Sequence, residues 1–388
     1  MITLFWISLA IVFYTFLGYG LVLFILIKIK RTFKKPQQHQ QQAILPRVTL
    51  LVAAWNEEDM IVDKINNTLD LDYPIELFQI IFITDGSTDR TPELILSFKQ
   101  ITALHNGDRN GKMAAIKRAM PYVDGEIIVF SDANTFLNRQ SINQLVKHYQ
   151  NKKVGAVAGE KRIIVAEQAD ASSAGEGFYW KYESKLKSWD YELYSNVGAA
   201  GELFSIRASL YQPVESDTII DDHMIAMRIA EQGFIIAYEP NAYASETASA
   251  NTKEELKRKI RIAAGGIQSI FRLKKAANPF RNPILTFQYI SHRVLRWTIT
   301  PFMLILAFIL NIFIVAGNYS QIYTILLLGQ ILFYTCSYIG LLFEQKNIKI
   351  KSFFVPYYFC VMNYAVIAGI FRYINKNQSA AWERSKRK

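Results

Sequence analysis

The sequence is poor in cysteine, because only Cys336 and Cys360 occur among its 388 residues and both lie in apolar stretches. Two cysteines placed in this way show neither the spacing of a zinc site nor the pattern of a disulfide framework. Motifs of nucleic-acid-binding domains are also missing, although the formal net charge is +11. Because the basic residues flank apolar segments, the excess charge indicates anionic lipid headgroups as a partner and not nucleic acid.

Apolar residues, in contrast, are abundant. Hydrophobic residues make up 51% of the chain and aromatic residues 13%, which is high for a purely soluble protein. A chain of 388 residues is long enough for one soluble domain with a complete core together with membrane segments. The composition therefore predicts a membrane protein that carries one sizeable soluble domain.

An uncharged apolar stretch, Leu4–Ile27, lies near the start of the chain. About 20 such residues cross a bilayer, so this stretch is long enough to span one. It has no basic residues before it and no clear small-residue cleavage site. Residues 1–30 are therefore expected to form a retained N-terminal transmembrane anchor and not a cleaved signal.

Basic residues follow this anchor at once, at positions 28, 30, 31, 34 and 35. Since basic flanks favour the cytoplasmic side, the N-terminus is expected outside and the following domain in the cytoplasm. Residues 31–46, rich in glutamine from 37 to 42, are expected to form a polar linker. The predicted location is the cell (inner) membrane, as a multi-pass protein.

Three further apolar stretches make residues 298–374 a predicted C-terminal transmembrane region. They are Thr298–Val315, Ile322–Phe343 and Phe353–Phe371. Four crossings would leave the tail at 375–388 outside, yet that tail is basic, so the crossing count and the charge rule disagree and its side stays open. The last stretch is expected to be the weakest crossing, because it contains Pro356 and Asn363.

Between residues 47 and 275 the pattern alternates between apolar runs and helix signals. The runs that predict buried strands are Val48–Ala54, Phe78–Thr84, Ile101–Leu104 and Glu126–Phe130. A short helix is expected over Gly111–Met120, and Asn56 is expected to cap another. Alternating strands and helices predict an α/β domain with a doubly wound sheet, which binds ligands at the carboxyl ends of its strands.

Three acidic clusters fall at such strand ends or helix starts. They are Asp85-Gly86-Ser87-Thr88-Asp89, Asp132-Ala133-Asn134 and Asp221-Asp222. Taken singly, each has an ordinary structural explanation, as a turn or as the cap of the helix that runs to Gln232. Taken together and in this order, they indicate carboxylates that converge on a cation, a sugar or a proton.

These residue types suit transfer from a nucleotide-activated sugar, whose diphosphate leaving group gains negative charge as the glycosidic bond breaks. Mg²⁺ or Mn²⁺ neutralises that charge and needs only one or two protein oxygen ligands, which Asp132 and Asn134 can supply. Lys112 at a helix start suits phosphate. The acceptor hydroxyl must lose a proton, so a carboxylate base is needed; Asp222 is the candidate, with Asp221 tuning its pKa.

Five strings then resemble the membrane-integrated family 2 glycosyltransferases, which include the synthases of cellulose, hyaluronan and poly-N-acetylglucosamine. The strings are Val52-Ala53-Ala54-Trp55-Asn56-Glu57-Glu58, the 85–89 cluster, Asn110-Gly111-Lys112, Phe130-Ser131-Asp132-Ala133-Asn134-Thr135 and Ile219-Ile220-Asp221-Asp222. The resemblance covers nearly the whole chain. It implies a GT-A (Rossmann-like) fold, a UDP-sugar donor and an inverting single displacement.

The resemblance also implies roles for individual residues. Asp85 corresponds to the nucleotide-binding aspartate, Asp132 and Asn134 to the metal-binding motif, and Asp222 to the catalytic base. The other donor-binding positions are Ala54, Trp55, Glu57, Lys112, Asp132, Arg258 and Arg261. The acceptor side is implied at Gly201 and Glu202, in the loop 198–202, and at Asp221.

Two features depart from the family pattern. Asn134 stands where aspartate is common, so one negative charge fewer faces the metal. The segment Arg258-Lys259-Ile260-Arg261-Ile262 replaces Gln-x-x-Arg-Trp of processive members. Arg261 keeps the arginine that binds diphosphate, whereas Ile262 removes the aromatic platform beneath the acceptor sugar, which argues against processive polymerisation.

Basic residues interleave with apolar ones over Lys253–Lys275 and again over residues 276–297. This pattern predicts interfacial amphipathic segments that lie on anionic lipid. The first of them would also hold Arg258 and Arg261 on one helix face, three residues apart.

The leading hypothesis is an inverting, metal-dependent transferase that moves a sugar from a UDP-sugar to a glycan acceptor in exopolysaccharide or cell-envelope synthesis, with possible partner subunits. One alternative is single addition to a lipid acceptor. Another is an inactive nucleotide-binding scaffold subunit of an envelope complex. The sequence predicts no particular sugar, linkage or oligomeric state.

Overall fold

The protein is described here from a computed structural model, which covers residues 1–33, 45–164, 171–247, 252–317, 320–346, 348 and 350–376. Most of the predicted linker at 31–46 and of the predicted basic tail at 375–388 lies outside these described residues.

An eight-stranded mixed sheet forms the centre of the soluble domain, in the order β3-β2-β1-β4-β7-β6-β8-β5. Its strands are β1 Val48–Ala54, β2 Phe78–Asp85, β3 Thr102–Asn106, β4 Ile127–Asp132, β5 Phe136–Leu137, β6 Val154–Ile164, β7 Phe204–Arg207 and β8 Ile235–Thr247. The first four predicted strands are confirmed within a few residues and pair in parallel. The second half was not predicted: β7 is antiparallel to both β4 and β6, so the sheet is mixed.

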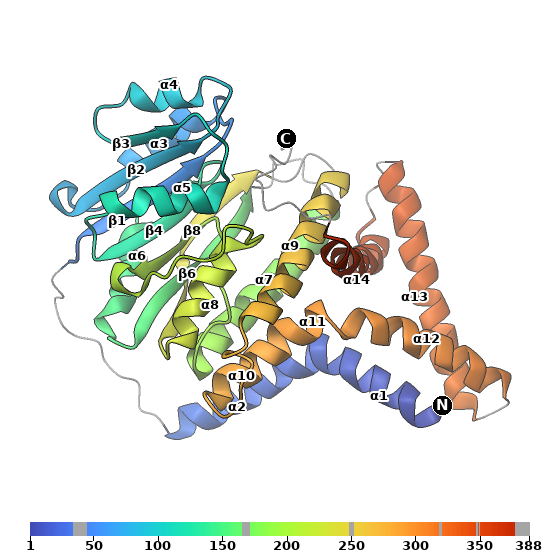
Figure 1. Cartoon of the computed structure of the whole chain (residues 1–388). Coiled ribbons are helices and arrows are strands. Elements are labelled where there is room, and N and C mark those ends of the chain that lie inside the picture. Colours follow the sequence, from blue (N-terminus) through green and yellow to red (C-terminus); the bar gives the residue numbers. More distant parts are fainter. Residues whose placement is uncertain are drawn as a thin grey trace.

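Helices cover both faces of this sheet (Figure 1). The helices of the soluble domain are α3 Ile61–Leu69, α4 Thr91–Leu96, α5 Lys112–Ala119, α6 Ser141–Val146, α7 Ala171–Leu193, α8 Asp221–Glu231 and α9 Thr252–Arg272. Asn56 does not cap a helix: it has a positive φ of 52°, and α3 begins only at Ile61.

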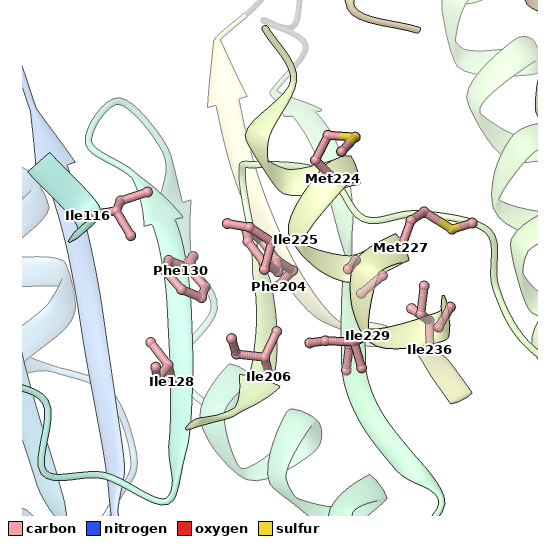
Figure 2. Close-up of a cluster of buried hydrophobic side chains, with 14 of the residues drawn as sticks. Ile116, Ile128, Phe130, Phe204, Ile206, Met224, Ile225, Met227, Ile229 and Ile236 are labelled. Carbon is pink, nitrogen blue, oxygen red and sulfur yellow. The ribbon is translucent and has the colours of Figure 1, made fainter. Parts of the chain in front are cut away.

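Alternating side chains of the strands point to opposite faces of the sheet and belong to two separate hydrophobic cores. Leu51, Ile128 and Phe130 point to the face covered by α5 and α8, whereas Leu50 and Val129 point to the opposite face. Figure 2 shows Ile225 and other α8 side chains packed over strands β4, β7 and β6. Because α8 is held by this apolar face, its first turn, which carries Asp221 and Asp222, is fixed relative to the sheet edge.

Apolar helices lie to one side of the sheet (Figure 1). They are α1 Ile2–Phe13 and α2 Tyr19–Phe33, joined by a π-helical turn Tyr14–Gly18, and then α10 Pro283–Tyr289, α11 Leu295–Trp297, α12 Thr300–Ala316, α13 Gln321–Gln345 and α14 Lys351–Ile374. Among the described residues, three helices are long and apolar enough to cross a membrane: Ile2–Phe33, Gln321–Gln345 and Ser352–Ile374.

A fourth crossing exists only if Pro283–Trp297 and Thr300–Ala316 form one span with a 59° bend. Of the three helices that could cross by themselves, the last, Ser352–Ile374, has the lowest mean hydropathy, 1.6 against 2.4 and 1.8. Which of the expected crossings is the weakest stays a prediction. Pro356 does not interrupt α14, which remains one helix from Lys351 to Ile374.

The two segments predicted to lie on lipid are each packed in part against the rest of the protein. Helix α9 packs closely on α14, where a Cβ atom added at Gly369 would lie only 2.6 Å from Ala263 Cβ. In the second segment, Gln288 and His292 are completely buried. Phe271 and Phe280 are exposed, so the interfacial role of these segments stays a prediction.

Candidate functional site

The loops that follow β1 and β2 are bound to each other. Trp55 Nε1 donates to the Gly86 carbonyl at 3.1 Å, and the Thr88 amide donates to Asn56 Oδ1 at 2.8 Å. The guanidinium of Arg109 lies over the Trp55 ring, 3.6 Å from its centroid. One face of Trp55, a predicted donor-binding residue, is therefore covered by an arginine in this structure, and no local sequence pattern indicates this interaction.

Asp85, at the end of β2, anchors the turn that begins helix α5. Its Oδ2 accepts from the Asn110 and Gly111 amides at 2.8 and 2.6 Å, while Arg118 Nη1 lies 3.0 Å from Oδ1. The carboxylate is 2% exposed. Through these hydrogen bonds Asp85 fixes the 110–111 backbone and so positions Lys112 at the edge of the sheet.

Lys112 joins carboxylates from two distant elements. Its ammonium nitrogen lies 2.9 Å from Asp132 Oδ1, at the end of β4, and 3.1 Å from Asp221 Oδ2, at the start of α8. Burial opposes the charge, but the two carboxylates outweigh it and raise the pKa of Lys112 above its usual range. Lys112 therefore stays protonated, and it contacts carboxylates where the sequence predicted a phosphate.

A second lysine, Lys64, forms hydrogen bonds to residues on either side of the Asp132–Asn134 turn. It is completely buried in α3 and donates to Ser131 Oγ at 2.8 Å and to the Thr135 carbonyl at 2.7 Å. Burial lowers its pKa to about 7. The sequence contained a signal that was missed: Lys64 interrupts the apolar face formed by Ile61 and Ile65, where a lone charge needs a specific partner.

Asp222 lies beside Asp221 in the first turn of α8, and its Oδ1 accepts from the His223 amide at 2.8 Å. Burial and the charge of Asp221 raise the pKa of Asp222 to about 7, against the opposing effect of Lys112. A carboxylate with such a pKa can take a proton near neutral pH, which is what a general base requires.

The carboxylates Asp132, Asp221 and Asp222 line one cavity of about 400 Å³. Ten of the thirteen predicted site residues line it: Glu57, Lys112, Asp132, Asn134, Gly201, Glu202, Asp221, Asp222, Arg258 and Arg261. The cavity lining does not include Ala54, Trp55 or Asp85. Asp85 is connected to it only through the 110–112 turn.

Two cavity residues predicted to bind ligand are engaged by other protein groups. Glu202 Oε1 lies 2.5 Å from Lys161 Nζ, and this contact, with Arg258, holds the pKa of Glu202 well below its usual range despite burial. Arg258 forms a two-pronged ion pair with Glu255, with both bonds at 3.0 Å. Arg261 donates to the Ile219 carbonyl at 3.3 Å, and its Nε is buried without a hydrogen bond among the described residues.

The residues around Asp132 fit a divalent cation bound together with a ligand. Within the described ranges, no group of three or more His, Cys, Asp or Glu side chains is arranged to hold a metal by itself. Asp132 Oδ2 faces Gly201, where an added Cβ would lie 3.2 Å away, so the glycine keeps this oxygen accessible. Asp132 and Asn134 would supply two oxygens, and phosphate and water the others, as Mg²⁺ commonly requires.

Two apolar helices contribute part of the cavity lining. Phe16 comes from the π-helical turn of the N-terminal helix, and Met362, Asn363, Ala365 and Val366 come from α14. Both helices are among the three that could cross a bilayer. The cavity is therefore lined both by the carboxylates of the soluble domain and by residues of the apolar helices.

Comparison with known proteins finds a family match in the soluble domain: residues 49–212 match the family model described as glycosyl transferase family 2. The chain is 32% identical over 182 residues to a β-monoglucosyldiacylglycerol synthase from a Nostoc species. The aligned region covers 44% of this chain and 37% of that protein. It is 26% identical over 249 residues to a poly-β-1,6-N-acetyl-D-glucosamine synthase from Staphylococcus aureus, covering 62% of this chain and 58% of that one.

A third relative, the probable glycosyltransferase YdaM of Bacillus subtilis, is 24% identical over 298 residues, which is 70% of each chain. Among solved structures, a mannosyltransferase from Pyrobaculum calidifontis, in complex with GDP-Man and Mn²⁺, superposes with a TM-score of 0.71. The superposition covers 97% of this chain and 100% of that one at 22% identity. It confirms the GT-A fold over nearly the whole chain.

Proposed function

Because residues 49–212 form a glycosyl transferase family 2 domain, we propose that this protein transfers a sugar from a UDP-sugar to a hydroxyl group of a membrane lipid, with inversion at the anomeric carbon. The observation that carries the proposal is the convergence of Asp132, Asp221 and Asp222 on a cavity that is also lined by residues of two apolar helices. The sequence analysis favours a glycan acceptor and keeps a lipid acceptor as an alternative. The apolar residues of this cavity favour the lipid.

In the proposed reaction, the acceptor oxygen forms a bond to the anomeric carbon as the bond to the diphosphate oxygen breaks. Asp222 takes the hydroxyl proton, and its pKa of about 7 suits that role. The bonding electron pair leaves with UDP. A bound Mg²⁺ or Mn²⁺ would neutralise the charge that develops on the diphosphate.

Other residues would position the reactants. Asp132 and Asn134 would hold the cation, and Arg261, whose Nε is buried without a partner among the described residues, would contact the diphosphate. Lys112 would keep Asp132 and Asp221 together, and Asp85 would hold Lys112 in place through the 110–112 turn. The soluble domain at 47–275 would face the cytoplasm, with the apolar helices in the cell membrane.

Addition to a growing glycan is a second candidate, favoured by the similarity to the Staphylococcus aureus relative. Ile262, in the position expected to hold an aromatic platform, lines the cavity. An aliphatic side chain there cannot stack on a sugar ring, which favours a single addition.

The test is a donor screen with the full chain in lipid nanodiscs. Release of nucleotide diphosphate from UDP- and GDP-sugars is measured with Mg²⁺, with Mn²⁺ and with EDTA, followed by mass analysis of the extracted lipids. One glycolipid that needs metal and a UDP-sugar is the expected product. A ladder of oligosaccharides would favour the second candidate, and no turnover of any donor would refute both.

A further inference from the structure

Arginine residues from the segment 290–297 form a basic wall in the same cavity as the three carboxylates. Arg293 and Arg296 line the cavity together with Trp297, and the two guanidinium side chains are 17% and 12% exposed. No role for this segment followed from the sequence beyond contact with lipid. The apolar residues Phe16 and Val366 line the same cavity.

Glu183 of helix α7 holds this wall in place. Its Oε1 lies 3.1 Å from Arg293 Nη1, and its Oε2 lies 2.8 Å from Arg296 Nη1. Burial opposes ionisation, yet His292 and the two arginines hold the pKa of Glu183 well below its usual range. One carboxylate is thus shared among three basic groups.

His292 lies between two buried carboxylates. Its Nε2 lies 3.1 Å from Glu183 Oε1, and its Nδ1 lies 2.5 Å from Asp190 Oδ2. The hydroxyl of Tyr19, in the N-terminal helix, donates to the other oxygen of Asp190. The position of Arg293 is therefore set by a buried network that reaches the N-terminal helix.

Arg293 keeps one end of its guanidinium for a ligand. Its Nη1 contacts Glu183 and its Nε lies 3.4 Å from the Val197 carbonyl, whereas no hydrogen bond engages its Nη2 among the described residues. Within the same ranges, Glu183 is the carboxylate that contacts it. A guanidinium edge that is fixed in place and faces a cavity is suited to bind the oxygens of a phosphate.

His223 provides a second polar atom in this part of the cavity. The residue is 4% exposed, lines the cavity and has no hydrogen-bond partner for Nε2 within the described ranges. Its ring is held between Trp297, with centroids 5.3 Å apart, and Gly198, where an added Cβ would lie 2.5 Å from Nδ1. A buried nitrogen without a partner is costly unless a ligand satisfies it.

Burial and the neighbouring charge of Arg293 lower the pKa of His223 to about 3. The imidazole is therefore neutral at physiological pH and can accept from, or donate to, a ligand atom. His223 and Asp222 line the same cavity.

We propose that Arg293 Nη2 and His223 Nε2 form an acceptor subsite that binds the phosphate of an anionic, hydroxyl-bearing lipid and so presents that hydroxyl to Asp222. The inference rests on the proposed transfer to a lipid and adds the chemical class of that lipid. The apolar residues Phe16, Met362 and Val366 of the same cavity would contact its hydrocarbon chains. Phosphate is the common anion of membrane lipids, and the guanidinium edge matches its geometry.

The experiment measures lipid binding without turnover, so that it is independent of the transfer reaction. Radiolabelled dioleoylphosphatidylglycerol and dioleoylglycerol, which differ in the phosphate headgroup, are bound to the detergent-solubilised full chain. Arg293→Gln is expected to weaken binding of dioleoylphosphatidylglycerol by about tenfold, as expected when a charge-assisted hydrogen bond is lost. Binding of dioleoylglycerol and of UDP is expected to stay unchanged.

Two further variants control for folding. Arg293→Lys keeps a positive charge for Glu183 but loses the forked contact, so it is expected to fold and still to bind the anionic lipid more weakly than the native chain. Arg31→Gln removes an arginine–glutamate pair with Glu192 on the same helix α7, away from the cavity, and is expected to bind both lipids normally. Thermal unfolding of each variant is measured alongside.

Three results would overturn the subsite. They are equal affinity of the native chain for the two lipids, unchanged lipid affinity in both Arg293 variants, or loss of UDP binding in place of lipid binding. Inorganic phosphate is added as a competitor. Displacement of the lipid by equimolar phosphate would overturn its assignment to a lipid headgroup, and resistance to displacement would support it. Selective lipid binding without sugar transfer would leave the subsite intact and refute only the proposed function.

Discussion

Lys112 and Asp132 form an ion pair across the carboxyl edge of the sheet, with 2.9 Å between Nζ and Oδ1. The same ammonium lies 3.1 Å from Asp221 Oδ2, so a lysine occupies the position between two carboxylates where a metal ion would also be attracted. Replacing Lys112 with Met removes that competing charge. We expect Mn²⁺ binding in the absence of donor to become about tenfold tighter, whereas sugar transfer falls.

Electron paramagnetic resonance of free and bound Mn²⁺ measures this change. Lys112→Arg, which keeps the charge, is the matched control and should bind Mn²⁺ as weakly as the native chain. Unchanged Mn²⁺ affinity in Lys112→Met would show that the lysine and the metal do not share these carboxylates.

Metal binding should depend on the nucleotide. Asp132 and Asn134 are the two protein ligands in the proposed site, and the remaining ligands would have to come from the diphosphate and water. Calorimetric titration of Mn²⁺ is expected to give millimolar-range affinity without UDP and at least about tenfold tighter binding with it. Equal affinities with and without UDP would mean that the protein forms the site by itself.

Asp222→Asn should abolish transfer while leaving UDP binding nearly intact. Only the base is lost, and general-base catalysis contributes roughly 10²- to 10⁴-fold in rate. Product formation in nanodiscs and UDP affinity by fluorescence competition give the two readouts. Substantial turnover by Asp222→Asn would remove this residue from the mechanism.

The pH dependence of kcat/KM should follow the pKa of Asp222, which burial and Asp221 raise to about 7. The base acts in its ionised form, so the rate should rise with pH up to about 7 and fall about tenfold per unit below it. In Asp221→Asn the neighbouring negative charge is gone, and the acid limb should move to lower pH. An acid limb of the pH profile that moves to higher pH, or that does not move, would contradict the claim that Asp221 raises the pKa of Asp222.

Arg258→Gln should destabilise the protein more than it weakens donor binding. Arg258 is paired with Glu255 and lies 3.6 Å from Glu246, so its loss removes one of at least two cations that compensate each of these buried carboxylates. We expect a loss of about 3 kcal/mol in the free energy of unfolding. Thermal and denaturant unfolding measure this loss. The control is Lys257→Gln, which removes a neighbouring ion pair whose lysine is exposed. A stable variant with lost UDP affinity would restore the donor-binding role expected from the sequence.

Much of the first half of the fold could be predicted because its signals are local. Val48–Ala54 and Phe78–Thr84 are continuous apolar runs with polar clusters directly after them, and such runs form buried parallel strands. The order of the second half could not be predicted. Strand β7 has only four residues and inserts between β4 and β6 by pairings that no local pattern specifies.

The candidate site shows the same division. Sequence order and residue type by themselves picked out Asp132, Asn134, Asp221 and Asp222, because carboxylates at strand ends and helix starts are recognisable locally. Only the tertiary structure decided that Lys112 lies between two of them, that Glu202 pairs with Lys161, and that α14 and Arg293 close the cavity. The physical reason is that periodicity and turn chemistry act over a few residues. The partner of a buried charge, in contrast, is whichever group the packed fold brings within about 4 Å.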